Sequence, residues 1–320
     1  MKNLFFTVLV FLLVHMIAYA QVEEKIVPTD LKQQTIVTQP ITLYKGFLRA
    51  GFAGGYTPLN KYFNDKSKKQ FFGSNIWGKT WFVLAMMQYG VTDRLQLEID
   101  LPYNITEQFQ SYRIEAPLFQ TDSVVAWKVK GSGISDLSFR AGYQLIKEST
   151  SRPALAAFLA FTAPTGEKNP TGVVSERNYK LPSGSGEPVL NLDLQLRKII
   201  FPYSYTAYLG YKYSFGGSKI FSPGEEEKEF KSGGYVNIGG TFDLSLNDWI
   251  ALQNGLDSFF YGKDEVEGVK EKAGKWIVQY FPRLNFQLKK LRLVQAVTVP
   301  LKGKTASADI TYLLVAQYMF

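Results

Sequence analysis

Residues 190–197 read LNLDLQLR, and a leucine alternates with a polar residue at every step. Successive side chains of a β-strand point to opposite faces, so the four leucines share one face of a strand. The other face then carries Asn191, Asp193, Gln195 and Arg197. The stretch therefore predicts a strand with one apolar face and one polar face.

The same alternation recurs along the chain, most clearly in LQLEIDL at 95–101 and in residues 137–145 and 276–284. It predicts twelve strands, at residues 43–56, 75–89, 94–107, 134–146, 153–163, 187–198, 203–215, 233–245, 249–261, 275–288, 290–300 and 308–320. An even number fits a chain that enters and leaves on the same side of a membrane. We expect an all-β fold: a transmembrane, antiparallel, up-and-down β-barrel. In the predicted strand at 290–300, the alternation does not decide which residues face lipid and which face the lumen.

The connections between the predicted strands alternate in length. Even-numbered strands are followed by brief turns, and odd-numbered strands by longer polar segments at 57–74, 108–133, 163–186, 216–232, 261–274 and 301–307. Outer-membrane barrels have short periplasmic turns and long external loops, and this pattern matches them. Charge runs such as Lys66 to Lys69 and Glu225 to Glu229 fall in the long segments, where we expect solvated loops.

The beginning of the chain is typical of a secretory signal peptide. Lys2 precedes an apolar run that ends near Val14, and Ala18-Tyr19-Ala20 resembles a cleavage site. We expect a signal peptide at 1–20, a periplasmic segment at 21–42 and a barrel at 43–320. The segment at 21–42 could instead enter the lumen. No later apolar run approaches the ~20 residues of a transmembrane helix.

The end of the chain carries one apolar face that reaches the last residue. It is formed by Ile310, Tyr312, Leu314, Ala316, Tyr318 and Phe320. This face resembles the C-terminal strand by which the barrel assembly machinery recognises outer-membrane proteins. Tyr318 and Phe320 are therefore the expected assembly signal, and that machinery is an expected partner.

A secreted β-sandwich would also show alternation and turns. Aromatic residues make up 15% of the chain and gather near the ends of predicted strands, as in Tyr211 with Tyr213. Aromatic girdles of this kind lie at the two membrane interfaces of outer-membrane barrels. Together with the terminal strand, they favour the barrel and the outer membrane of a Gram-negative bacterium.

Four stretches of the chain are similar to one family. They read TIVTQPITLYKG at 35–46, LQLEIDLPYN at 95–104, GISDLSFRAGYQL at 133–145 and PALAAFLAFTAPTG at 153–166. They resemble the outer-membrane family named after the meta-pathway of phenol degradation. The resemblance implies a barrel with a role in the passage of hydrophobic or aromatic compounds.

The residue types limit the chemistry. The chain has no cysteine, and its one histidine, His15, lies in the predicted signal peptide. Barrel phospholipases, proteases and acyl-chain enzymes use a histidine base, which leaves Glu98 with Asp100 as the acid–base candidate pair. An interior ion-pair network explains this pair better, with Arg140, Arg283 or Arg197 as partners. We expect no enzyme, no cofactor, no metal site and, despite the net charge of +8, no nucleic-acid partner.

The polar faces of the predicted strands bear charges of both signs. We expect these residues to line the lumen: Arg49, Glu98, Asp100, Asp136, Arg140, Asp193, Arg197, Asp243, Asp257, Lys275, Arg283 and Asp309. The predicted function is a channel for passive passage of small solutes, with hydrophobic or aromatic compounds among the candidates. The alternative is a closed structural or adhesive barrel that acts through its loops. Expected partners are outer-membrane lipid and lipopolysaccharide, whose phosphates would meet Lys66, Lys68 and Lys69.

Overall fold

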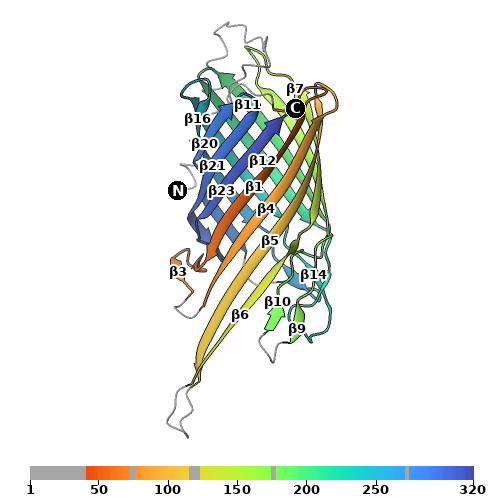
Figure 1. Ribbon diagram of the computed structural model, residues 1–320, viewed down its shortest axis with the longest axis vertical. Coiled ribbons are helices and arrows are strands. Elements are labelled where there is room, and N and C mark those ends of the chain that lie inside the picture. Colours follow the sequence, from red (N-terminus) through yellow and green to blue (C-terminus); the bar gives the residue numbers. More distant parts are fainter. Residues whose placement is uncertain (1–40, 73–75, 115–122, 174–177, 271–273) are drawn as a thin grey trace.

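The computed structural model describes residues 41–72, 76–114, 123–173, 178–270 and 274–320. Twelve long antiparallel strands wrap into a closed barrel (Figure 1). No stretch within those ranges forms a helix long and apolar enough to cross a bilayer. The predicted fold class is confirmed.

The twelve strands follow one another around the ring in chain order. They are β1 (Leu48–Leu59), β4 (Ile76–Gly90), β5 (Leu95–Ile114), β7 (Leu137–Ile146), β8 (Ala154–Ala163), β11 (Val189–Ile200), β12 (Tyr203–Ser214), β15 (Tyr235–Ser245), β16 (Ile250–Tyr261), β19 with β20 (Lys275–Tyr280 and Arg283–Leu288), β21 (Leu291–Lys304) and β23 (Thr311–Met319). The ring closes because β1 pairs with β23, from Arg49 opposite Met319 to Tyr56 opposite Tyr312. Closure leaves the barrel wall without an unpaired edge.

The outward face of the wall is apolar and exposed. On β11, Leu192 and Leu194 are 46% and 39% exposed. The same holds for the outward residues of β4 and β5, which include Trp81, Leu97 and Ile105. A water-soluble monomer rarely exposes so continuous an apolar surface, so this face meets lipid.

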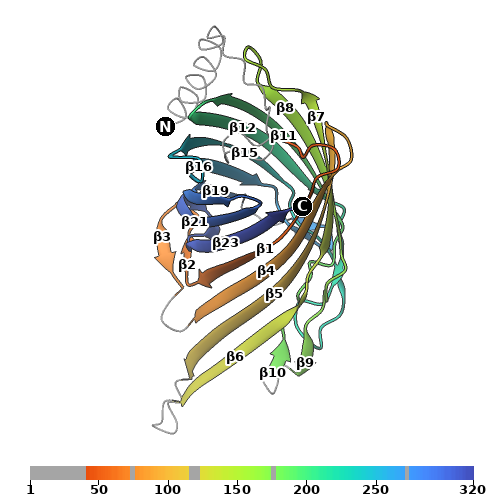
Figure 2. The ribbon, with the colours of Figure 1, turned by 45° about the horizontal axis from the view of Figure 1, so that its top comes forward.

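All short connections lie at one end of the barrel with the C-terminus, and all long ones lie at the other (Figure 1). We call these the short-turn end and the long-loop end. Figure 2 brings the short-turn end forward and shows the strands enclosing one interior. The predicted alternation of connection lengths is confirmed.

Several strand boundaries differ from the predictions, and three of the differences change the architecture. β5 continues to Ile114 and pairs with β6 (Ser123–Ile134), so the expected loop at 108–133 is largely a hairpin. β1 begins at Leu48 and not at residue 43. The tenth strand is interrupted at Phe281 and Pro282, because proline has no N–H to donate to the ladder.

The other long loops contain short strands of their own. β2 (Lys61–Phe63), β3 (Lys69–Phe71) and β22 (Ala306–Ser307) form one small sheet. A second contains β13 (Gly217–Lys219), β14 (Lys228–Lys231), β17 (Glu265–Val266) and β18 (Val269–Lys270), while β9 (Thr171–Val173) and β10 (Asn178–Lys180) join β6. The charge runs in these loops are exposed to solvent as expected, since Lys66, Lys68 and Lys69 and most of Glu225 to Glu229 are exposed, but the short strands themselves were not predicted. Strands of two to four residues are too short to show a period of two.

Candidate functional site

A row of polar side chains crosses four neighbouring strands on the face opposite the exposed leucines. The register aligns Arg49, Gln88, Glu98 and Arg140 on β1, β4, β5 and β7. Arg49 Nη1 donates a hydrogen bond to Gln88 Oε1 at 3.3 Å, and Gln88 Nε2 donates to Glu98 Oε2 at 2.9 Å. Glu98 thus lies directly across the ladder from Arg140, one of its three predicted partners.

Arg140 connects this row to the next strands. Its Nη2 lies 3.5 Å from Asp193 Oδ2, and its guanidinium carbon lies 4.3 Å from the centre of the Phe158 ring. Arg140 lines two small cavities, of about 220 and 170 Å³, the first with Asp100 and Asp193 and the second with Arg49 and Glu98. The structure therefore brings four other predicted residues together around Arg140.

The remaining strand residues of the prediction have other partners. Arg197 Nη2 lies 3.4 Å from Glu148 Oε2, and Ser204 Oγ donates to Asp243 Oδ2 at 2.9 Å. Asp257 accepts a hydrogen bond from Tyr208. Arg283 pairs with Gln253 on the neighbouring strand, and Gln253 pairs in turn with Asp243 on the strand after that.

Three predicted residues lie at the long-loop end. Asp136 is buried and accepts hydrogen bonds from the backbone of Gly166 and Ser185, so it fixes the loop after β8. Lys275 Nζ lies 2.6 Å from Asp264 Oδ2. Asp309 is buried beside a large cavity.

Sequence reasoning missed Arg292 and Glu148. Arg292 Nη2 donates to Asn285 Oδ1 at 3.0 Å inside the barrel wall. Its position between Leu291 and Leu293 was an available signal. Glu148 lies in a short turn and folds back onto Arg197, which no strand period predicts.

Residues before β1 turn into the mouth at the short-turn end. Thr42 and Leu43 are 1% and 4% exposed, and the Leu43 N–H donates to Gln96 Oε1 at 2.9 Å. The first strand was predicted to begin at residue 43, but residue 43 belongs to the segment that packs into the short-turn end of the barrel. Residues 1–40, with the predicted signal peptide and most of 21–42, lie outside the described residues.

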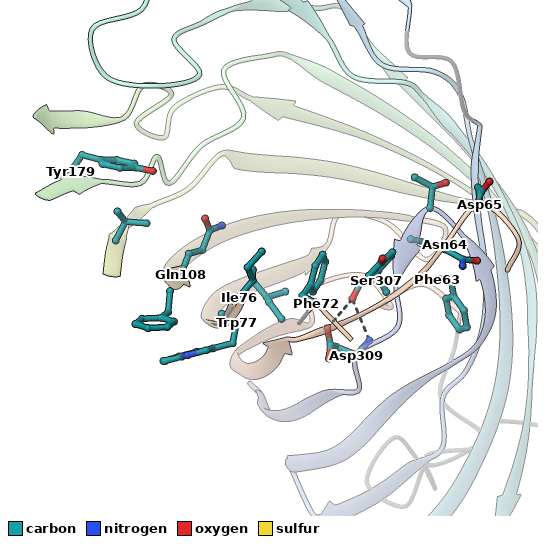
Figure 3. Close-up of a pocket in the computed structure, with 17 residues that line it drawn as sticks. Phe63, Asn64, Asp65, Phe72, Ile76, Trp77, Gln108, Tyr179, Ser307 and Asp309 are labelled. Carbon is teal, nitrogen blue, oxygen red and sulfur yellow. Dashed lines mark hydrogen bonds between the residues drawn. The ribbon is translucent and has the colours of Figure 1, made fainter. Parts of the chain in front are cut away.

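A large cavity lies at the long-loop end and measures about 720 Å³ (Figure 3). Its aromatic lining comes from the loop sheet, from β4 and β5 and from β10: Tyr62, Phe63, Phe72, Trp77, Phe109 and Tyr179. Tyr62 stacks on Phe72 with ring centroids 4.7 Å apart, and Trp77 on Phe109 at 5.3 Å. A cavity of this size and lining suits a small apolar molecule.

A metal site would need several ligating side chains close together. Within the described ranges no three acidic or histidine side chains gather as metal ligands would. Glu98 is hydrogen-bonded to Gln88, and Asp100 lies beside Arg140 in the 220 Å³ cavity. Both carboxylates thus belong to the interior polar network.

No family model matches the chain. Among solved structures, an outer-membrane channel from Pseudomonas putida F1 aligns with a TM-score of 0.66 at 14% identity, over 92% of this chain and 100% of that one. The toluene transporter TodX of P. putida and the translocator domain of the autotransporter NalP of Neisseria meningitidis both align less well. Each has a TM-score of 0.47, with 8% identity over 86% of this chain and 90% of that one for TodX, and 9% over 87% and 90% for NalP. The chain therefore shares the barrel fold of the P. putida F1 channel.

Proposed function

We propose that the protein is a channel in the outer membrane of a Gram-negative bacterium, through which small solutes pass without an energy source. Apolar and aromatic compounds are the solutes it suits best. In such barrels the short turns face the periplasm and the long loops face outward. The proposed role is transport and not catalysis.

The observation that carries the proposal is the 720 Å³ cavity at the long-loop end. Six aromatic side chains line it, and the loops that form it are held by backbone pairing of β2, β3 and β22. A preformed apolar site on the outside gives a poorly soluble compound a place to leave water.

Further along the barrel the interior is polar and carries both signs of charge. The twelve charged residues of the sequence prediction are proposed to line or border the passage, with Arg140 between the two smaller cavities. Mixed charges keep such a passage wet without strong selection for one sign of ion.

Two further observations support the proposal. The P. putida F1 structure with the same fold is titled an outer-membrane channel. The similarity of residues 35–46, 95–104, 133–145 and 153–166 to the phenol meta-pathway family points the same way.

The test compares Phe72→Gln, which makes the cavity wall polar, with Phe201→Gln on an exposed ring in a short turn at the other end of the barrel. Both are expressed in a strain that lacks the gene, and uptake of a radiolabelled neutral aromatic compound is measured. Phe72→Gln should reduce the initial rate several-fold, and Phe201→Gln should match the wild type. Equal rates for both variants would contradict a role for the cavity.

The alternative is a closed barrel that acts through its loops. The observation in its favour is the insertion of Thr42 and Leu43 into the short-turn end. Deletion of residues 109–132 separates the two functions. A closed barrel would lose adhesion while permeability stayed unchanged, whereas the proposed channel would change its uptake rate.

Biogenesis and lipid contacts complete the proposal. Tyr318 and Phe320, whose rings are 4.9 Å apart on the last strand, are the proposed signal for the barrel assembly machinery. Lys66, Lys68 and Lys69, in and beside the exposed turn between β2 and β3, are proposed to contact phosphates of lipopolysaccharide.

A further inference from the structure

The lining of the 720 Å³ cavity is acidic, although the chain as a whole is basic. The chain has 36 basic and 28 acidic residues, yet among the described residues the cavity lining contains two carboxylates, Asp65 and Asp309, and neither lysine nor arginine. Aromatic faces carry a negative quadrupole, so the rings add to the same sign of potential. The cavity therefore favours a positive ligand group over a negative one.

Asp309 is the buried member of the pair, at 4% exposure. Its Oδ2 accepts hydrogen bonds from the backbone N–H groups of Asn60 and Lys61, each at 3.0 Å. Its Oδ1 is buried, and nothing in the described part of the chain donates to it. A buried acceptor without a donor is costly, so a positive group placed near this carboxylate would offset part of that cost.

Hydrogen bonds to the loop sheet hold the segment of Asp309 in place. The Ala308 N–H donates to the Lys61 carbonyl at 3.0 Å, which ties the segment before β23 to the loop sheet. Lys61 extends its ammonium over the Phe71 ring, 5.1 Å from the centroid. Figure 3 shows Asp309 beside Ser307, with Phe72 close by and Tyr179 on the far side.

We propose that this cavity binds a small organic ammonium ion with an aromatic or apolar body. The ammonium group lies beside the carboxylate of Asp309, which borders the cavity, and the body packs among Tyr62, Phe63 and Phe72. The ring faces attract the charge as well as the apolar body. This inference rests on the proposed function, because it names the class of solute that the same site prefers.

The test uses the full-length protein in lipid nanodiscs and three probes of similar shape. These are 2-phenylethylammonium, 2-phenylethanol and 3-phenylpropionate, with binding measured by calorimetry against empty nanodiscs. The ammonium ion should bind at least tenfold more tightly than the alcohol, and the carboxylate most weakly. This comparison needs no variant and therefore does not depend on the folding of one.

Asp309→Asn then replaces the carboxylate by a group of the same shape. It should reduce the preference for the ammonium ion over the alcohol to less than threefold. Asp248→Asn, in a short turn at the other end of the barrel, removes the same charge and should leave that preference intact. Heat-dependent mobility on gels confirms that each variant is folded.

The inference is overturned if the wild type binds the ammonium ion no better than the alcohol, or if none of the probes binds. It is also overturned if folded Asp309→Asn keeps the full preference. Each of these results can occur while neutral aromatic compounds are still taken up through the channel. Loss of all uptake would count against the proposed function instead.

Discussion

Arg140 is the residue on which the interior charges converge. It faces Glu98 across the ladder, lies 3.5 Å from Asp193 and borders both small cavities. Removing one member of such a group leaves a polar partner without its bond, which costs about 1–3 kcal/mol. The local potential also becomes more negative, because the acids lose one of their positive partners.

Arg140→Gln should therefore make the channel more selective for cations. In planar bilayers with a KCl gradient, the reversal potential should move toward the K⁺ equilibrium potential. Arg152→Gln, on an exposed turn, removes the same charge outside the barrel and serves as the control. Identical reversal potentials for both variants would show that Arg140 does not border the ion path.

Gly90 determines whether residues 41–47 can pack at the short-turn end. A Cβ at Gly90 would lie 1.9 Å from the Tyr44 carbonyl oxygen, so no other residue fits without moving the segment. In contrast, a Cβ at Gly54 would meet nothing closer than 4.0 Å. Position 90 needs glycine because the Tyr44 carbonyl packs against it, and not because its backbone angles are unusual.

Because the chain has no cysteine, Thr42→Cys introduces a single thiol at a buried position. Its reaction with a maleimide should be slow, and adding Gly90→Ala should speed it at least tenfold. Adding Gly54→Ala instead should have little effect. If the thiol reacts quickly in all three proteins, the segment does not occupy the mouth.

Alternation alone predicted that Glu98, Arg140 and Asp193 lie on the polar faces of their strands, because a strand fixes which face each residue occupies. It offered Arg140 only as one of three possible partners of Glu98. It could not predict that Glu148 reaches Arg197 from a turn, or that Asp309 holds the backbone of Asn60 and Lys61. Those contacts depend on how turns and loops fold back. That information is not contained in a period of two.

The β5–β6 hairpin is the element that extends furthest beyond the barrel (Figure 1). The outward apolar residues of β5 run from Leu97 to Ile105, about 27 Å of strand and roughly 20 Å of height at the usual tilt. Glu107 follows, beyond this apolar face. Lysines from both neighbouring strands surround it, with Lys128 at 2.9 Å, Lys130 at 3.1 Å and Lys79 at 3.2 Å.

Hydrogen bonds from Lys128 and Lys130, with a smaller one from Lys79, lower the pKa of Glu107 from 4.5 to about 2. A lowered pKa means that the ionised group stabilises the hairpin above about pH 4.5. This stabilisation is lost as the pH falls toward 2. Pepsin cleavage within 105–130 should thus accelerate between pH 4.5 and pH 2.

In Glu107→Gln that acceleration should be absent, since the amide does not titrate. Glu229→Gln, an acid in another loop sheet, should keep it. An unchanged pH profile in Glu107→Gln would show that other groups control the hairpin.

The last strand closes the ring through backbone bonds that include Phe320, whose N–H donates to the Leu48 carbonyl at 2.8 Å. Deleting Phe320 should reduce the amount of heat-modifiable protein in outer-membrane fractions. Phe320→Tyr keeps an aromatic end and should assemble normally. Normal assembly of the deletion would remove Phe320 from the proposed signal.

At the level of elements, the sequence was sufficient for all twelve strands of the ring, since each is long enough to repeat its pattern. It failed for β6, which was assigned to a loop, and for the break at Pro282. Some of the short loop strands also pair with partners far away in sequence, such as β22 beside β2. Local patterns do not contain those partners.

The whole molecule is a closed barrel whose two ends differ. The long-loop end holds a cavity of about 720 Å³ with aromatic walls, while the interior toward the short-turn end contains two cavities of about 220 and 170 Å³. Thr42 and Leu43 narrow the short-turn end further. Such a shape is consistent with a channel for small solutes and not with a wide, general pore.

The central claim is that this barrel conducts. The most direct measurement is single-channel recording of the purified protein in planar bilayers. The account predicts small, discrete openings well below the conductance of a general porin, and a larger conductance when residues 41–47 are displaced by Gly90→Ala. Folded protein that inserts into the bilayer and gives no current above the empty membrane, in both forms, would contradict it.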